Sequence, residues 1–278
     1  MIEALGLDYF GAAVLAGVIV GALCGLVGVL VLLRRRAFYT VALTHATFPG
    51  GVAAAVLGVN ISIGAGVFGL VLVGLMTWLT SIRRQGEQVA AGVVLSFGYA
   101  LGQVLLSLNT NLPVKVDTFL AGSILAIPRE NLLALAVLLV AVVACYAAYG
   151  KELLFSSFDR RGFRAAGYSE ELVDLLALGL ITLTVVLAMP AIGSILAIAM
   201  IAAPAAAARK LVKRVGWMLI LAGVFGVLAA VAGLVVSREW GVAAGGAMAL
   251  AAALIYVLAS GVDAARRLVH TRRGAAAQ

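Results

Sequence analysis

Long apolar runs recur along the whole chain and decide what it can fold into. Several of them hold 18 or more mostly apolar residues, enough at about 1.5 Å per residue to cross a hydrocarbon core of about 30 Å. The chain is 64% hydrophobic and only 12% charged, and a water-soluble domain of 278 residues could not bury so much apolar surface. The runs do not alternate as the strands of a membrane barrel would. The sequence therefore predicts an all-α, polytopic membrane bundle that forms one domain over residues 1–278.

Polar residues divide the apolar runs into nine predicted spans. Their approximate bounds are 10–33, 38–57, 61–82, 88–108, 130–149, 172–190, 193–208, 216–236 and 241–262. With the N-terminus outside, 17 of the 20 Lys and Arg residues fall on the inner side, and Lys115, Arg129 and Arg238 remain outside. An eight-span arrangement would disturb this bias. The favoured topology is therefore nine spans with a cytoplasmic C-terminus, in a multi-pass protein of the cell membrane.

Two polar stretches between the spans depart from simple loops. The inner segment 152–174 mixes phenylalanines with arginines, which is the composition of a short interfacial helix. Such a helix either rests on lipid or docks another protein at the inner face. The outer segment 109–129 carries two prolines and several polar residues, and it is long enough for a docking surface or a short re-entrant element. A basic cytoplasmic tail is expected from about residue 263 to 278.

The most informative polar residues lie inside the second predicted span, where segment 42–51 reads ALTHATFPGG. His45 is one of two histidines, and the other, His270, belongs to the basic tail. Ionisable residues at membrane depth usually mark a pathway for an ion or substrate. Pro49 lacks an N–H and cannot bond the carbonyl of His45, which in lipid needs another partner or a cavity. We therefore predict a substrate pathway at His45, Thr44 and Pro49; the alternative is a histidine that only hydrogen-bonds a neighbouring helix.

Motifs of common enzymes and ATPases are missing from the sequence. It contains no G-x-x-x-x-G-K-[ST], no nucleophile elbow and no H-E-x-x-H. A permanent closed zinc site would need about four nitrogen, sulfur or carboxylate ligands, whereas transport needs weak contacts that also release the ion. The prediction is a transport subunit that is not an enzyme, has no ATPase site of its own, holds no permanent cofactor and binds no nucleic acid.

Several motifs occur in unbroken order from about residue 30 to 210. RRRAF at 34–38 precedes ALTH at 42–45 and FPG at 48–50, and AGVVLS at 91–96 follows. Further along come FLAGSIL at 119–125, FD and AAG at 158–167, and IGSIL with APAAAA at 192–208. Together they resemble the permease subunits of the zinc/manganese/iron ABC importers, which typically show a basic-aromatic stretch, D-A-L-S-H and L-P-G at the first of these places.

The resemblance implies partners, a cargo and site residues. It implies a permease homodimer, a cytoplasmic ATP-binding subunit that carries the ATP, and an extracytoplasmic metal-binding protein. The cargo would be a divalent transition metal, zinc first and manganese next, with His45 as a transient ligand. Ser96 and Ser123 become weaker candidates for the pathway. Segment 150–171 would be the coupling segment, and its residues at the ATPase contact would be Asp159, Arg160, Arg161, Arg164 and Gly167.

The sequence departs from the family at two acidic positions. Val41 stands where an acid usually precedes the histidine by four residues, and Ser123 stands where the L-F-G-D stretch has its acid. Both replacements remove negative charge that would attract a divalent cation, so a chelated substrate, as in a cobalamin- or siderophore-type permease, remains an alternative. Two other classes also remain open: a secondary transporter driven by an ion gradient, with a broken helix near the midplane, and a non-transporting membrane scaffold.

Overall fold

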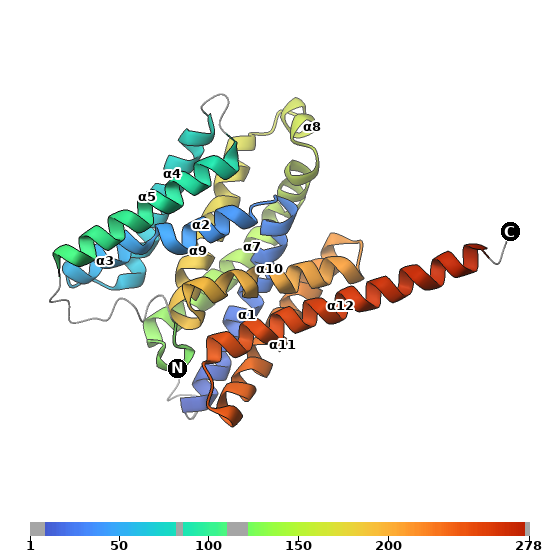
Figure 1. Ribbon diagram of the computed structural model, residues 1–278. Helices are drawn as coiled ribbons and strands as arrows, with labels where there is room; N and C mark the ends of the chain where they lie inside the picture. The colour runs from blue at the N-terminus through green and yellow to red at the C-terminus, as the bar shows by residue number, and fades with distance from the viewer. Residues whose placement is uncertain (1–8, 82–85, 110–121, 276–278) are drawn as a thin grey trace.

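The computed structural model describes residues 9–81, 86–109 and 122–275, and within these ranges the regular structure is helical, as predicted. Figure 1 shows the arrangement. The elements are α1 (Tyr9–Leu33), α2 (Ala37–Ala46), α3 (Phe48–Val56), α4 (Ile61–Ser81), α5 (Glu87–Leu108), the 3-10 turn η1 (Ile124–Ala126), α7 (Arg129–Phe158), α8 (Arg160–Ala165), α9 (Glu170–Ile192), α10 (Ser194–Leu211), α11 (Val215–Trp240) and α12 (Ala244–Ala275).

In the described part of the chain, seven helices are long and apolar enough to cross a membrane: α1, α4, α5, α7, α9, α11 and α12. An α-helix satisfies its own backbone N–H and C=O groups and can therefore cross lipid, and several such helices make the protein a multi-pass membrane protein. The two other predicted spans coincide with the α2–α3 pair and with α10, a helix of 18 residues. Helix α12 continues to Ala275, beyond the predicted span end at 262, and Figure 1 shows its C-terminal part projecting from the bundle.

The second predicted span is broken in two, as its Pro-Gly pair indicates. Helices α2 and α3 have 10 and 9 residues, so neither alone crosses a membrane. Thr47 joins them, and its carbonyl accepts hydrogen bonds from the backbone N–H groups of Gly50 (3.1 Å) and Gly51 (3.4 Å). Pro49 lies in the first turn of α3, where its missing N–H is not needed.

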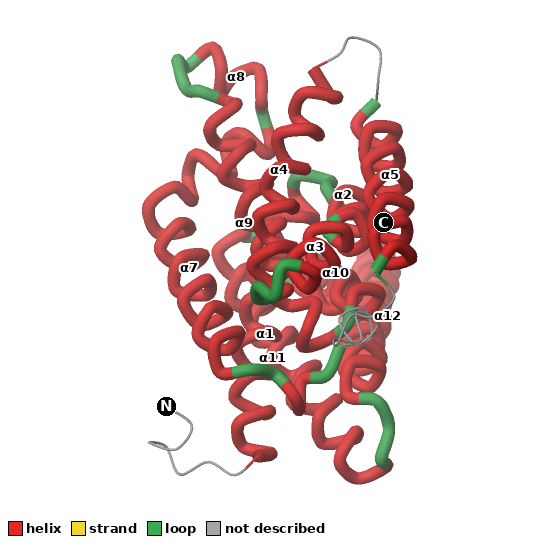
Figure 2. The backbone as a smooth tube through the Cα atoms, turned by 90° about the vertical axis from the view of Figure 1, so that its left-hand side faces the viewer, coloured by secondary structure: helices red, strands yellow, loops and turns green. Residues whose placement is uncertain are grey.

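Close glycine contacts hold the centre of the bundle together. Helix α1 packs against α11, with the backbone of Gly21 against that of Gly226 and Gly25 against Ala222. A Cβ atom at either glycine of α1 would overlap the facing backbone. Absent side chains therefore let the helices approach as small-residue membrane interfaces do. Helices α1 and α9 are the most buried of the seven spans, and both also contact α7 (Figure 2).

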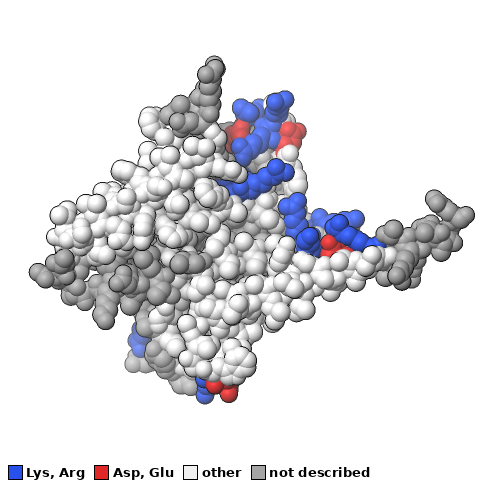
Figure 3. Space-filling view, in the orientation of Figure 1, with Lys and Arg blue, Asp and Glu red and all other residues white. Residues whose placement is uncertain are grey.

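Charged residues gather at one end of the bundle. The end formed by the α1–α2 turn, α8 and the α10–α11 turn is called the basic end here, and its residues include Arg34, Arg160, Arg164, Arg209 and Lys210. Figure 3 shows most of the blue Lys and Arg atoms on its right-hand side, with a few acidic atoms among them, and a smaller charged group at the bottom. The α3–α4, α9–α10 and α11–α12 turns form the opposite end, where Arg238 lies over the ring of Phe10.

Candidate substrate pathway and coupling surface

Helix α2 places His45 against α5. Gly98 of α5 lies on the backbone of Ala46, and Gly102 lies against the ring of Phe48, so the two glycines let α5 approach the break between α2 and α3. This contact brings Tyr99 to His45: their ring centroids are 6.0 Å apart with an edge-to-face angle of 65°. Tyr99 also stacks on Phe48 at 6.0 Å. Tyr99 was not a predicted site residue, because nothing in the local sequence pairs it with position 45.

Hydrogen bonds fix one side of the His45 ring. The Thr44 hydroxyl donates to the carbonyl of Val41 (2.7 Å), and Thr44 Oγ1 lies 2.8 Å from His45 Nδ1. Since the hydroxyl hydrogen is committed to Val41, we assign Nδ1–H as the donor to the Thr44 oxygen. The same nitrogen lies 3.4 Å from the Val41 carbonyl. This tautomer leaves a lone pair on Nε2, which is how a ligating histidine is oriented by the partner of its other nitrogen.

The described surroundings of His45 offer few groups that could ligate a metal ion. Its side chain is half-buried, while Thr44 and Thr47 are buried. Within residues 9–81, 86–109 and 122–275, no three His, Cys, Asp or Glu side chains cluster as a metal-binding group. One imidazole nitrogen with nearby hydroxyl and carbonyl oxygens would bind a metal ion only weakly.

The other predicted pathway residues are spread over the protein. Ser96 is exposed on α5, one turn before Tyr99, and is therefore on the same side of that helix. Pro49 is buried in the first turn of α3. Ser123 is exposed just before η1 at the opposite end, and its N–H donates to the carbonyl of Pro190 (2.9 Å) where α9 ends. Across the described residues, no hydrogen bond links Ser96 or Ser123 to His45.

At the basic end, the predicted coupling segment contains a short helix with defined ends. Asp159 precedes α8, and its carboxylate accepts from the N–H of Gly162 (2.9 Å), which satisfies a free donor of the first turn. Gly167 closes the helix in the left-handed region at φ 84°, where its N–H donates to the Arg164 carbonyl. Phe163 is fully buried and stacks on Tyr168, so α8 is anchored by one apolar side chain.

Glu170 of α9 holds the arginines of α8. Its carboxylate lies 2.9 Å from Arg164 Nε and 3.6 Å from Arg160 Nη1. Arg161 and Asp159 are exposed on the same short helix and its cap. The exposed charges of α8 thus face outward from the basic end, while Glu170 keeps the helix beside α9.

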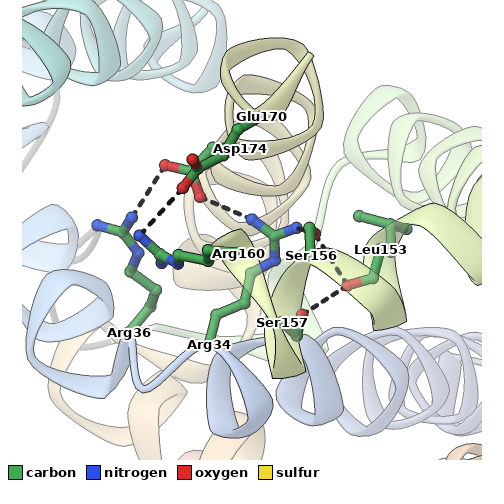
Figure 4. A network of polar contacts seen from close by, with 8 residues as sticks. All are labelled: Arg34, Arg36, Leu153, Ser156, Ser157, Arg160, Glu170 and Asp174. Atoms are coloured by element: carbon green, nitrogen blue, oxygen red, sulfur yellow. Dashed lines mark hydrogen bonds and ion pairs between the residues drawn. The ribbon is translucent and has the colours of Figure 1, made fainter. Parts of the chain in front are cut away.

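A second ion network beside α8 was not predicted. Asp174 of α9 accepts from Arg34 Nη1 (2.6 Å) and from Arg36 Nη2 (2.9 Å), and Arg34 Nη2 donates to Ser156 Oγ (2.6 Å). Figure 4 shows these side chains, which come from α7, α9 and the α1–α2 turn. Asp174 follows Glu170 by one helical turn, and this spacing is the one local signal that could have drawn attention to it.

A pair of short helices that together replace one span, inside a bundle of membrane-spanning helices, is an arrangement found in membrane transport proteins. The sequence matches the ABC 3 transport family over residues 7–263, and the chain belongs to that family. It is 32% identical to the manganese transport system membrane protein MntC of Halalkalibacterium halodurans over 92% of this chain and 88% of that protein. It is also 32% identical to the manganese import system permease protein ScaB of Streptococcus gordonii, over 88% of each.

Among solved structures, PsaBC from Streptococcus pneumoniae in complex with Fab superposes with a TM-score of 0.82 at 30% identity, covering 93% of each chain. The chain is thus a permease subunit of a metal ABC importer, as the sequence motifs indicate, and not a catalytic enzyme. Membership of this family also accounts for the order of the motifs between residues 34 and 208.

Proposed function

We propose that this permease carries a divalent transition metal inward and that His45 Nε2 contacts the ion in passing. The observation that carries this proposal is the hydrogen bonding of Nδ1, which leaves Nε2 as the free ligand beside the helix break. Imidazole nitrogen is a favourable ligand for zinc, copper, iron and nickel, and oxygen donors are favourable for manganese. The family resemblance of the sequence favours zinc first, whereas the manganese names of the two relatives favour manganese as the main cargo, with zinc second.

The proposed orientation has the basic end in the cytoplasm and the N-terminus outside. It rests on the positive-inside bias and on the cations gathered around α8. In this orientation α8 meets a separate ATP-binding subunit through Asp159, Arg160, Arg161 and Arg164, while Gly167 ends the helix. Segment 150–171 is then the coupling segment, and α12 leads into the cytoplasmic tail.

The proposed assembly contains two copies of the permease. In each copy, the side of the bundle where His45 meets α5 would face a metal pathway shared by the two copies. Tyr99 and Ser96 are exposed on the adjoining face of α5 and would belong to the wall of that path. At the opposite end, the exposed Ser123 and η1 would lie under an extracytoplasmic metal-binding protein. These assignments follow the family resemblance together with the exposure of the residues named.

Uptake by the complete complex in proteoliposomes tests the proposal. The permease, co-expressed with its ATP-binding subunit, is supplied with a panel of manganese, zinc, iron and cobalt ions together with its binding protein. His45→Ala should lower metal uptake at least tenfold while membrane insertion is unchanged, and His270→Ala in the tail is the matched control. Uptake by His45→Ala at the wild-type rate would remove His45 from the pathway. Uptake that needs an ion gradient and no ATP would overturn the importer itself.

A further inference from the structure

The most buried charges at the basic end belong to Arg34 and Arg36, which are 7% and 6% exposed. They flank Arg35 in the α1–α2 turn, and Arg35 adopts a positive φ of 57°. Both guanidinium groups bind the carboxylate of Asp174 on α9. Buried charges are costly unless paired, so removal of this carboxylate would take from both arginines the ion pair that Asp174 provides.

The Asp174 carboxylate binds two arginines at once. Burial lowers the pKa of the Arg34 guanidinium, the neighbouring Asp174 raises it, and Arg160 of α8 lowers it again. A guanidinium stays charged in spite of such shifts. The influence of Arg160 is informative because it comes from the proposed coupling helix. Arg160 of α8 is therefore close enough to Arg34 for their charges to repel each other.

Asp174 and Glu170 occupy successive turns of α9 and hold different elements. Glu170 binds Arg160 and Arg164 of α8, while Asp174 binds the two arginines of the α1–α2 turn. Two acids four residues apart lie on one side of a helix. The first two turns of α9 thus join α8 to the start of α2 through ion pairs, as Figure 4 shows for Arg160, Glu170, Asp174, Arg34 and Arg36.

A second polar contact, closer to His45 than the Asp174 ion pairs, joins α2 to α9. The hydroxyls of Tyr39 and Thr182 lie 3.2 Å apart and both residues are buried. Arg36 immediately precedes α2, and its carbonyl accepts from the Thr40 hydroxyl (3.0 Å). A helix of ten residues is about 15 Å long and moves as one body. Displacement of Arg36 therefore displaces His45.

We propose that Asp174 is a positioning residue that couples the ATPase-contacting helix α8 to the helix that carries His45. A shift of α8 pulls on Glu170, the first turns of α9 move with it, and Asp174 passes the displacement through Arg36 to α2. This inference rests on the proposed function, because it requires that α8 meets the ATP-binding subunit and that His45 contacts the cargo. It adds the physical connection between the two sites.

The test measures metal uptake and ATP hydrolysis together in proteoliposomes of the complete complex, with manganese and the binding protein present. Asp174→Asn should lower the manganese carried per ATP about fivefold or more, the range of an ordinary coupling free energy. Asp174→Glu keeps the carboxylate and should recover most of the ratio. Glu171→Gln, an exposed acid in the first turn of the same helix, is the matched control and should keep the wild-type ratio.

A purely structural role would lower uptake and hydrolysis in proportion and leave their ratio unchanged, and that result would overturn the inference. If Asp174→Asn does not insert, Glu170→Gln breaks only the partly exposed link to α8 and should lower the same ratio; a wild-type ratio there would also overturn it. Absence of uptake by the wild-type complex for every metal of the panel would refute the proposed function, and the inference with it. If the wild type takes up metal but the variants keep the wild-type ratio, the inference about Asp174 fails while the proposed function stands.

Discussion

The rings of His45 and Tyr99 meet edge to face, 6.0 Å apart and at 65°, although they come from different helices and lie 54 positions apart in the sequence. Tyr99 also stacks on Phe48, just beyond the break between α2 and α3. One aromatic side chain of α5 therefore touches both halves of the broken helix. Tyr99 contacts the imidazole ring, while Thr44 hydrogen-bonds its Nδ1.

Replacement of Tyr99 separates the role of its ring from that of its hydroxyl. An aromatic pair contributes about 0.5–1.5 kcal/mol beyond its area, so Tyr99→Ala should raise the KM for manganese uptake about twofold to tenfold. Tyr99→Phe keeps the ring and should stay close to wild type. The measurement is the concentration dependence of uptake by the complete complex. An equal loss in both variants would transfer the role to the hydroxyl.

Gly98 sets the distance between α5 and α2. A Cβ atom there would lie 2.7 Å from the Cα of Ala46, so Gly98→Ala must push the helices apart. Overpacking of this kind costs about 1–3 kcal/mol, and the thermal midpoint in detergent micelles should fall together with uptake. Gly92→Ala on the same helix meets no atom within 4 Å and is the control. An unchanged midpoint in Gly98→Ala would contradict the close packing.

The features of the fold that could be predicted from the sequence are those with local sequence signals. Hydropathy places the spans, and Pro49 with Gly50 and Gly51 places the break between α2 and α3, because a missing N–H acts within one helical turn. The sequence was insufficient where partners are distant. Arg34 and Asp174 lie 140 positions apart, and nothing in either segment names the other. Ser123 lies at the opposite end of the bundle from Arg34, and its role in the pathway stays a prediction. So does the docking role of segment 109–129, whose residues 110–121 lie outside the described residues.

Thr44 hydrogen-bonds Nδ1 of His45, which leaves Nε2 as the nitrogen that would contact the proposed cargo. Thr44→Val keeps the shape but removes the oxygen that accepts from Nδ1–H, so the ring is free to turn or to change tautomer. Loss of such a partner typically costs about 10–100-fold in metal affinity. Uptake at limiting manganese should fall by about tenfold, and Thr44→Ser, which restores the hydroxyl, should recover it. Normal uptake by the valine variant would show that the ring is held by other contacts.

Val41 offers the sharpest test of how charge sets transport at this site. It lies one turn before His45, its side chain is half-buried, and its carbonyl already faces the imidazole. Val41→Asp adds a carboxylate beside the proposed ligand, and a unit charge at about 4 Å is worth roughly 1–4 kcal/mol at effective dielectrics of water to protein surface. The KM for manganese should therefore fall about tenfold. The maximal rate should fall as well, because an ion held more tightly leaves more slowly. Val41→Asn is the uncharged control of the same size as the aspartate. Equal kinetics in the two variants would show that the cargo does not pass within reach of this turn of α2.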